Sequence, residues 1–242
     1  MKEFENTLGV LIMGEAIMIK AIFFDLFFTL IYPQYSIVDN EYDILNLTKE
    51  EWEEYAENPI LYEERALGKV ESEDEIMNRI LNLLPNKIDK EQRERLLHSR
   101  LNRMKRAFEN VDDEIIYTLQ ELKKHNIKLC LISNADVIDC KYWQKSKLST
   151  YFDESIFSCE VGLLKPDIRI YRLAMERMGV TASESLFVGD GGSNELFGAK
   201  QAKMRTVCTE HIERKEEDQR ISILRNADLR IDRIQELLQY ID

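Results

Sequence analysis

Cysteine and histidine are scarce in this chain, and their spacing argues against the common metal and disulfide motifs. None of the four cysteines belongs to a C-x-x-C pair, and the three histidines are scattered without metal-ligand spacing. Cys130 and Cys208 occur in apolar runs, where buried free thiols are common. We therefore expect neither a disulfide framework nor a zinc site, and we expect the reducing environment of the cytoplasm.

Basic residues are also in deficit. The chain contains 33 lysines and arginines but 45 aspartates and glutamates, which gives a formal net charge of −12. A basic stretch between Arg93 and Arg106 is interrupted by glutamate, so a solvated helix face explains it better than a binding patch. We therefore expect neither nucleic acid nor an anionic membrane surface as a partner.

A long apolar run without charges is missing as well. Residues 16–32 are nearly all apolar, but Lys20 and Asp25 interrupt them, and each charge costs about 2.5–3.5 kcal/mol near the centre of a membrane helix. The stretch is also short for a membrane span. The first residues lack the basic start of a signal peptide. Residues 1–17 are therefore interpreted as an N-terminal extension of unknown structure.

The length of 242 residues suffices for one large domain or for a domain with an insertion. Two different patterns of hydrophobic periodicity divide this chain. Residues 33–110 show helical periodicity with almost no strand signal. Thr48 and Ser72 each begin a capping box, and Asn58 followed by proline is typical of a helix start. This block predicts a small helical bundle that is inserted after the first strand.

From residue 111 onward, strand-like and helix-like segments alternate. Short apolar runs at 127–132, 185–188 and 205–208 are separated by amphipathic segments. Such alternation is typical of a parallel, doubly wound α/β sheet. The expected helices span about 113–125, 137–145, 166–179, 193–202 and 234–241. The predicted domains are a core domain of residues 18–32 and 111–242, and a helical domain of residues 33–110.

Polar side chains fall where the apolar runs end. Asp25 directly follows the apolar run Ala21–Phe24, and although such an Asp can simply end a strand, the carboxyl ends of parallel strands also form a ligand crevice. A carboxylate nucleophile, a hydroxyl, an ammonium and a second acid that helps to bind Mg²⁺ make a coherent chemical set. The segments concerned are Asp25 with Thr29, Ser133 with Asn134, Lys165 with Pro166 and Asp167, and residues 189–195.

These four segments resemble the motifs of the haloacid dehalogenase-like (HAD) hydrolase superfamily. Asp25-Leu-Phe-Phe-Thr29 is similar to the first motif, Ser133 to the second, Lys165 in the run KPD to the third, and GDGGSNE to the fourth. The likeness extends from residue 19 to about residue 208. It implies a Rossmann-like core, with the helical block as a cap domain inserted between the first and second motifs.

The resemblance also implies roles for individual residues. Asp25 is expected to be the nucleophile, and Lys165 to steady it and, with Ser133, to bind the transferred group. Asp25, Asp190 and the backbone carbonyl of Phe27 are expected to bind Mg²⁺. The remaining predicted site residues are Asn194 and Glu195 as further metal ligands, and Thr29 and Asn134 as substrate-binding residues.

Phe27 departs from the pattern of the family's phosphatases, which carry a second Asp at this position as general acid and base. Positioned acid–base catalysis is typically worth about 10²–10⁴-fold, and a phenyl ring cannot move a proton. The family's 2-haloacid dehalogenases carry an aromatic residue there, since halide leaves without a proton. They work without a metal, however, whereas the metal-binding motif of this chain is complete.

Three hypotheses follow, in this order. The first is a Mg²⁺-dependent phosphatase of a small phosphorylated metabolite, and so of a small anionic substrate. The second is a 2-haloacid dehalogenase, and the third is a catalytically impaired scaffold with a binding role. Within the helical block, Tyr62, Arg65 and Lys69 could reach an anionic substrate, although a solvated face is at least as good an interpretation.

Overall fold

The computed structural model describes residues 18–241, so the extension predicted for residues 1–17 lies outside the described residues. In the described part of the chain, six strands form one parallel sheet in the order β3-β2-β1-β4-β5-β6. The predicted doubly wound α/β fold is thereby confirmed. The strands are β1 (Ala21–Phe24), β2 (Lys128–Ser133), β3 (Glu154–Phe157), β4 (Ser185–Gly189), β5 (Arg205–Thr209) and β6 (Leu229–Ile231).

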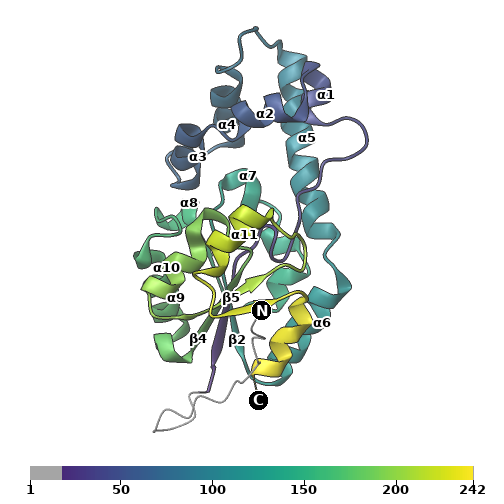
Figure 1. The fold of residues 1–242 in the computed structure, drawn as a ribbon. Coiled ribbons are helices and arrows are strands. Elements are labelled where there is room, and N and C mark those ends of the chain that lie inside the picture. The colour runs from purple at the N-terminus through teal and green to yellow at the C-terminus, as the bar shows by residue number, and fades with distance from the viewer. Residues whose placement is uncertain (1–17, 242) are drawn as a thin grey trace.

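Strand β1 lies in the middle of the sheet, and the chain winds away from it in two directions (Figure 1). It first builds β2 and β3 on one side and then returns to build β4, β5 and β6 on the other. The reversal lies between β1 and β4, which pair in parallel from Ala21 opposite Ser185 to Phe24 opposite Val188. In open α/β sheets, ligands bind at such a reversal, outside the carboxyl ends of the strands.

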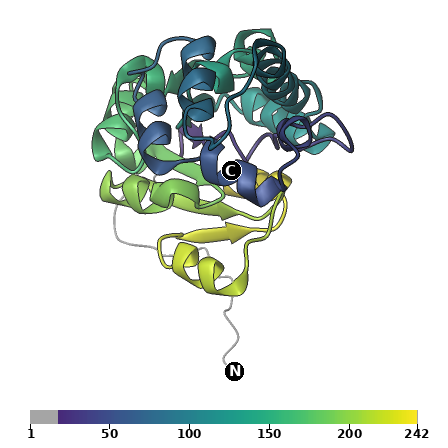
Figure 2. The same cartoon turned by 90° about the horizontal axis from the view of Figure 1, so that it is seen from above.

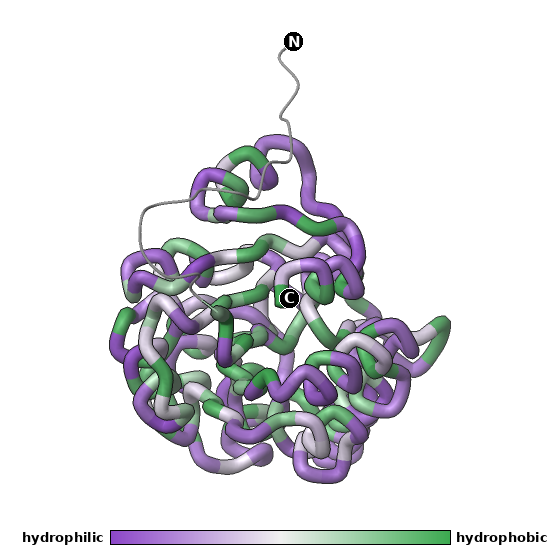
Figure 3. Tube along the Cα trace, turned by 90° about the horizontal axis from the view of Figure 1, so that it is seen from below, coloured by the Kyte–Doolittle hydropathy of each residue, from purple (hydrophilic) through white to green (hydrophobic). Residues whose placement is uncertain are grey.

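Helices cover both faces of this sheet. Successive side chains of a strand point to opposite faces, so Ile22 and Phe24 enter one hydrophobic cluster while Ala21 and Phe23 enter another. This explains why all residues of β1 are buried and apolar. Figure 3 shows apolar segments gathered toward the middle of the molecule. The first layer contains α6 (Asp113–Lys124) and the 3₁₀ helix η5 (Ile234–Tyr240), and the second contains α9 (Ile168–Met178) and α10 (Glu195–Gln201).

A further group of helices lies between β1 and α6 in the chain and beyond the carboxyl ends of the strands (Figures 1 and 2). We call it the five-helix unit. It has its own hydrophobic cluster, centred on Trp52, Ile76 and Leu96. The predicted capping box of Thr48 is present. The helices of the unit are α1 (Glu41–Leu45), α2 (Lys49–Ala56), α3 (Pro59–Ala66), α4 (Glu73–Leu81) and α5 (Lys90–Glu109).

The boundaries differ from the sequence prediction in four places. The helix predicted over 137–145 is only α7 (Val137–Cys140) followed by a 3₁₀ turn, and the one predicted over 234–241 is the 3₁₀ helix η5. Helix α11 (Glu217–Leu224) was not predicted, because none of its residues is buried and its apolar stripe is weak. Strand β6 was also missed, since it is a short strand at the sheet edge.

The remaining short elements connect these layers. No helix within residues 18–241 has the length and apolar character of a membrane span. The short elements are α8 (Ser158–Val161), η1 (Trp143–Lys145), η2 (Leu148–Thr150), η3 (Ala182–Glu184) and η4 (Gly192–Asn194).

Candidate active site

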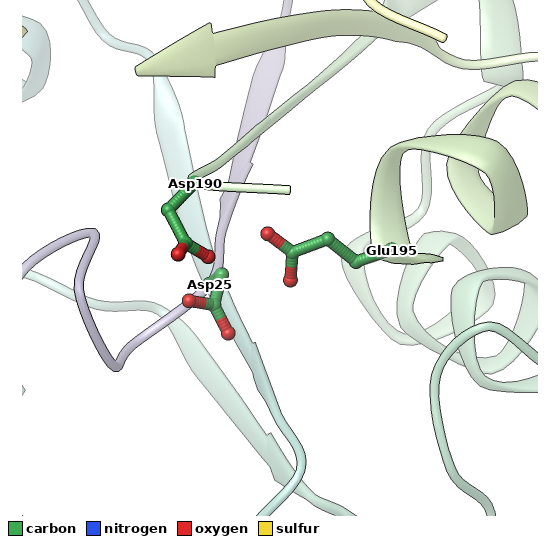
Figure 4. A group of neighbouring side chains, drawn as sticks. All are labelled: Asp25, Asp190 and Glu195. Atoms are coloured by element: carbon green, nitrogen blue, oxygen red, sulfur yellow. The ribbon is translucent and has the colours of Figure 1, made fainter. Parts of the chain in front are cut away.

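Three carboxylates meet at the carboxyl ends of β1 and β4 (Figure 4). Asp25 directly follows β1, Asp190 directly follows β4, and Glu195 is the first residue of α10. Their side chains point toward one another, although they are far apart in the sequence. Because β1 and β4 pair in parallel, their ends lie side by side. The topology of the sheet therefore creates this cluster.

The cluster has the composition of a site for a hard divalent cation. One oxygen atom from each of Asp25, Asp190 and Glu195 lies within 4.8 Å of the others, and all three residues are buried. Mg²⁺ prefers carboxylate oxygens and keeps several water ligands. Cys and His, which softer metals prefer, do not belong to this group within the described residues. The donor set therefore fits Mg²⁺.

The ammonium of Lys165 lies between two of these carboxylates. Its Nζ donates hydrogen bonds to Asp25 Oδ1 and to Glu195 Oε2, the second at 2.6 Å. Burial lowers the pKa of Lys165, but the charges of Asp25 and Glu195 outweigh burial and raise it above its ordinary value. Lys165 therefore stays cationic and holds Asp25 in one orientation.

Burial also governs the acidic groups. It raises the pKa of Asp25, while the charge of Lys165 opposes this rise and that of Asp190 adds to it. Burial, followed by the charge of Asp25, raises the pKa of Glu195 well above its usual range. Burial and the charges of neighbouring carboxylates raise the pKa of each acidic group, and a bound cation would lower it again. The electrostatics of the cluster thus agree with its donor set.

Thr29 connects the first polar segment to the fourth. Its fully buried hydroxyl donates to Asp25 Oδ2 and accepts from the backbone N–H of Asp190, both at 3.0 Å. The hydroxyl thus has a donor and an acceptor partner inside the protein. Thr29 orients the carboxylate of Asp25, and its direct contact with substrate stays a prediction.

The end of β2 contributes two further polar groups. Ser133 is fully buried, and its Oγ has no hydrogen-bond partner among residues 18–241. Since an unpaired buried hydroxyl is unfavourable, an anion with an oxygen acceptor would complete its bonding. The side-chain amide of Asn134 instead holds the backbone of Lys165, accepting from its N–H at 2.8 Å and donating to its carbonyl at 3.0 Å. Asn134 therefore positions Lys165 and also lines the cavity.

Glu195 reaches the cluster because Gly189 leaves room for it. A Cβ atom at Gly189 would overlap the carboxylate of Glu195. The backbone N–H of Gly191 donates to Glu195 Oε1 at 3.1 Å, which fixes this side chain from the other side. Asn194 differs, because it is exposed and has a left-handed backbone with φ of 52°. Its predicted role at the metal stays a prediction.

Phe27 occupies the position where a general acid was expected in a phosphatase. Its side chain is partly buried and packs against the cluster of the core and that of the five-helix unit. It also lines the cavity beside Asp25. An apolar ring thus contacts both parts of the molecule at this position, and it offers no proton to a bound molecule.

Lys215 belongs to the site but was missed in the sequence. Its Nζ lies 3.0 Å from Asp190 Oδ2 and 4.7 Å from the centroid of the Phe28 ring, and the residue lines the cavity. It comes from the connection between β5 and α11, in a run of charged residues that is typical of a solvated loop. The sequence contains no signal that separates Lys215 from its charged neighbours.

A cavity of about 380 Å³ adjoins the carboxylate cluster and is bounded on the other side by the five-helix unit. This size suits a small molecule. Tyr62 and Arg65 line the cavity as the sequence suggested, whereas Lys69 is exposed and is not among the lining residues. Two arginines of α5, Arg100 and Arg103, line it as well. They were missed because they belong to a helix whose charges looked solvated.

Comparison with known proteins identifies the family of this chain. Residues 19–203 match the model of a family described as haloacid dehalogenase-like hydrolase. A glyceraldehyde 3-phosphate phosphatase of Methanothermobacter thermautotrophicus is 38% identical over 93 residues, which are 37% of this chain and 40% of that protein. A phosphoserine phosphatase of Thermus thermophilus is 33% identical over 117 residues, or 46% of this chain and 45% of that protein. The chain therefore matches less than half the length of these curated relatives.

Solved structures show the same fold. A 2-haloacid dehalogenase from Pseudomonas syringae superimposes with a TM-score of 0.62 at 23% identity, covering 93% of this chain and 98% of that one. An enzyme from Bacteroides thetaiotaomicron, solved with magnesium and inorganic phosphate, gives a TM-score of 0.61 at 18% identity, covering 83% of this chain and 98% of that one. At such identities the likeness concerns the fold alone.

Proposed function

Because this chain belongs to the haloacid dehalogenase-like hydrolase family, we propose that it is a Mg²⁺-dependent phosphatase of a small phosphorylated metabolite. The observation that carries this proposal is the buried cluster of Asp25, Asp190 and Glu195 at the reversal of the sheet. A site of three carboxylates and an ammonium suits a reaction in which a cation offsets a phosphate. The curated relatives that are named as phosphatases support the same choice.

The residues that would hold the cation are Asp25, Asp190 and Glu195, together with the backbone carbonyl of Phe27. When bound, Mg²⁺ would supply positive charge that stabilises the transferred phosphoryl group. Asp190 is held by Lys215 and Glu195 by Lys165, so both ligands have fixed directions in the protein. Asn194, which is exposed, would complete the set through a water molecule.

In the proposed reaction, the Asp25 carboxylate attacks phosphorus and the bond to the ester oxygen breaks. This gives an acyl phosphate on Asp25 and releases the alcohol. Water then attacks the phosphorus, which restores the carboxylate and releases phosphate. Lys165 holds Asp25 throughout, and the unpaired hydroxyl of Ser133 is the donor that would bind a phosphoryl oxygen.

Phe27 limits the first step. The leaving alkoxide must take its proton from water, because the side chain at this position has no proton to give. We therefore expect slow turnover of alkyl phosphates and faster turnover of aryl phosphates, whose phenoxide is a weaker base.

We further infer that the five-helix unit is a cap domain, with residues 33–110 as cap and residues 18–32 and 111–242 as core. The cavity between these parts is lined from both sides, by Asp25 and Lys165 of the core and by Tyr62 and Arg65 of the unit. A cover of this kind reduces access of water and strengthens electrostatic interactions within the site.

Trapping the intermediate tests the proposal. The protein is mixed with an aryl phosphate and Mg²⁺, quenched in acid, reduced with borohydride and analysed by peptide mass spectrometry. An acyl phosphate on Asp25 would be reduced to homoserine, so the modification should appear at residue 25 alone. Turnover without any modification at Asp25, or modification of another residue, would overturn the proposed mechanism.

A second candidate function is 2-haloacid dehalogenation, which the aromatic side chain of Phe27 favours. In that reaction Asp25 attacks carbon and halide leaves without a proton, so Phe27 would be no disadvantage. The two candidates differ in their need for a cation. Turnover of a haloacid that persists in excess chelator would favour the dehalogenase, and phosphate-ester hydrolysis that stops in chelator would favour the phosphatase.

A further inference from the structure

Three buried arginines form part of the cavity wall that belongs to the five-helix unit. Arg65 lies on α3, and Arg100 and Arg103 lie on α5. Arginine remains charged in proteins, and a buried charge is strongly unfavourable unless it is paired and hydrogen-bonded. The partners of each guanidinium therefore show whether the protein itself accounts for its burial.

Two of the three guanidinium groups have close partners. Arg65 donates to the carbonyl of Ala56 at 2.7 Å and to Glu57 Oε2 at 2.6 Å, and its Nε, which makes no hydrogen bond within the described residues, forms an ion pair with Asp136 Oδ2 at 3.1 Å. Arg103 donates to a buried glutamate, Glu41, at 3.1 Å, and it stacks on an aromatic ring of the same unit. Neither of these residues requires a ligand for its pairing.

Arg100 is different. It is 1% exposed, and its Nε and Nη1 atoms have no hydrogen-bond partner among residues 18–241. Its carboxylate contact within this part of the chain is from Nη2 to Glu57 Oε1 at 3.6 Å, too long for a good hydrogen bond. The same Glu57 is already held by Arg65. Arg100 thus places a buried, charged guanidinium with unpaired N–H donors at the wall of the cavity.

From this we infer that Arg100 is a specificity residue that binds a carboxylate of the substrate, and that the substrates are small phosphorylated carboxylic acids. This inference rests on the proposed phosphatase function, because the phosphate end must lie at Asp25. The planar guanidinium matches a carboxylate in a bidentate geometry. A cavity of about 380 Å³ holds only a short molecule between Asp25 and Arg100.

The surroundings favour a carboxylate over a second phosphate. Glu53, Glu57 and Asp139 line the same cavity, so a dianion at Arg100 would meet more repulsion than a monoanion would. Burial, followed by the charge of Asp136, raises the pKa of Asp139 to about 7. Asp139 is therefore partly protonated near neutral pH and repels a bound carboxylate less than an ionised acid would.

A matched pair of substrates isolates the carboxylate. 3-Phosphoglycerate and glycerol 3-phosphate have the same chain length and differ in a carboxylate against a hydroxymethyl group. The wild-type protein should prefer 3-phosphoglycerate in kcat/KM. Arg100→Met should lower that preference by about 10- to 100-fold, the equivalent of one charge-assisted hydrogen bond. Arg100→Lys should lower it less, since it keeps the charge but loses the fork.

Arg95→Met is the control, because Arg95 lies on the same helix but is exposed. It should leave the preference unchanged. The ratio of the kcat/KM values for the two substrates, measured in one preparation, does not depend on the fraction of folded protein. If Arg100→Met and Arg100→Lys each lowered kcat/KM equally for both substrates, Arg100 would have only a structural role, and the inference would be overturned.

Binding separates this inference from the proposed function. Calorimetry on Asp25→Asn protein measures the dissociation constants of both compounds without turnover. Tighter binding of 3-phosphoglycerate that is lost in Asp25→Asn/Arg100→Met supports the carboxylate site, even if the wild-type protein hydrolyses neither ester and the phosphatase proposal fails. Equal binding of both compounds, together with hydrolysis of both, overturns the role of Arg100 and leaves the phosphatase proposal standing.

Discussion

The cavity has two walls that are both rich in buried charge, but the walls are constructed differently. At the strand ends, charged groups from distant segments are tied to one another, as Lys165 is to Asp25 and Glu195. On the wall of the five-helix unit, Arg100 keeps donors that are unpaired within the described residues. The difference suggests that the first wall is preorganised for the reaction and that the second is completed by the bound molecule.

Preorganisation at the strand ends is expected from catalysis by fixed charges, which need no rearrangement when the reaction occurs. Unpaired donors on a buried arginine, by contrast, are unfavourable in the free protein and gain an acceptor on binding. The comparison therefore predicts that substitutions at the strand ends affect all substrates, whereas substitutions at Arg100 affect only some.

The strongest expected effect is at the nucleophile. Asp25→Asn should lower kcat for every substrate by on the order of 10⁴-fold or more, as loss of a nucleophile does in other enzymes. The measurement is kcat for one aryl phosphate, with thermal unfolding as a check of the fold. Asp113→Asn, an exposed change on α6, should leave kcat intact. Activity close to wild type in a folded Asp25→Asn protein would contradict the role of Asp25 as the nucleophile.

The metal site provides the next largest effect. Asp190→Ala should weaken Mg²⁺ binding by more than about 10²-fold, since even outer partners of metal ligands contribute 10- to 100-fold. Activity should fall in parallel and recover partly at high Mg²⁺. Mg²⁺ affinity is measured by calorimetry on the wild-type and variant proteins. An unchanged affinity would show that Asp190 is not a ligand.

Phe27→Asp should restore the missing acid. The gain in kcat/KM should be largest for an alkyl phosphate, up to about 10²-fold at the low end of acid–base contributions, and smallest for an aryl phosphate. Phe27→Asn removes the same ring from the same packing but carries no titratable proton. A gain that appears equally in Phe27→Asn would come from space or hydration, and the missing-acid explanation would be wrong.

The smallest expected effect concerns stability, at a buried carboxyl group of the core that lines the cavity. Burial and Asp136 raise the pKa of Asp139 to about 7, whereas the unfolded chain releases this proton near pH 4. The folded protein therefore binds more protons between these values, and its free energy of unfolding should fall as pH rises through this window, by at most about 1.4 kcal/mol per pH unit.

Asp139→Asn should remove this part of the pH dependence. Urea unfolding of both proteins at about pH 5 and about pH 7 measures the difference. The variant should be less sensitive to pH than the wild type. Equal pH dependence in the two proteins would mean that Asp139 is ionised in the folded protein throughout this range.

The sequence predicted the strand-end wall because parallel topology places residues that follow successive strands at one edge. Asp25, Asp190 and Glu195 could therefore be grouped before any coordinates were known, and so could Lys165. The capping box at Thr48 likewise fixed the start of α2 from local chemistry alone. These features depend on neighbours along the chain or on the order of the strands.

The second wall could not be predicted in the same way. Arg100 is buried only because α5 packs against α7 and the rest of its unit, and its sequence neighbours are charged as on any solvated helix. Lys215 comes from a charged loop for the same reason. Thr29 and Asn134, whose predicted contact with substrate stays a prediction, also bond to Asp25 and to Lys165, and the sequence did not indicate these bonds. Such pairings depend on side-chain geometry in three dimensions.

The most direct test of the central claim is a substrate panel with and without Mg²⁺. It compares an aryl phosphate, an alkyl phosphate and 2-chloropropionate, each with saturating Mg²⁺ and with excess chelator. We predict that both phosphate esters are hydrolysed, the aryl ester faster, that this hydrolysis stops in chelator, and that no chloride is released. Chloride release that continues in chelator, with both phosphate esters untouched, would contradict it.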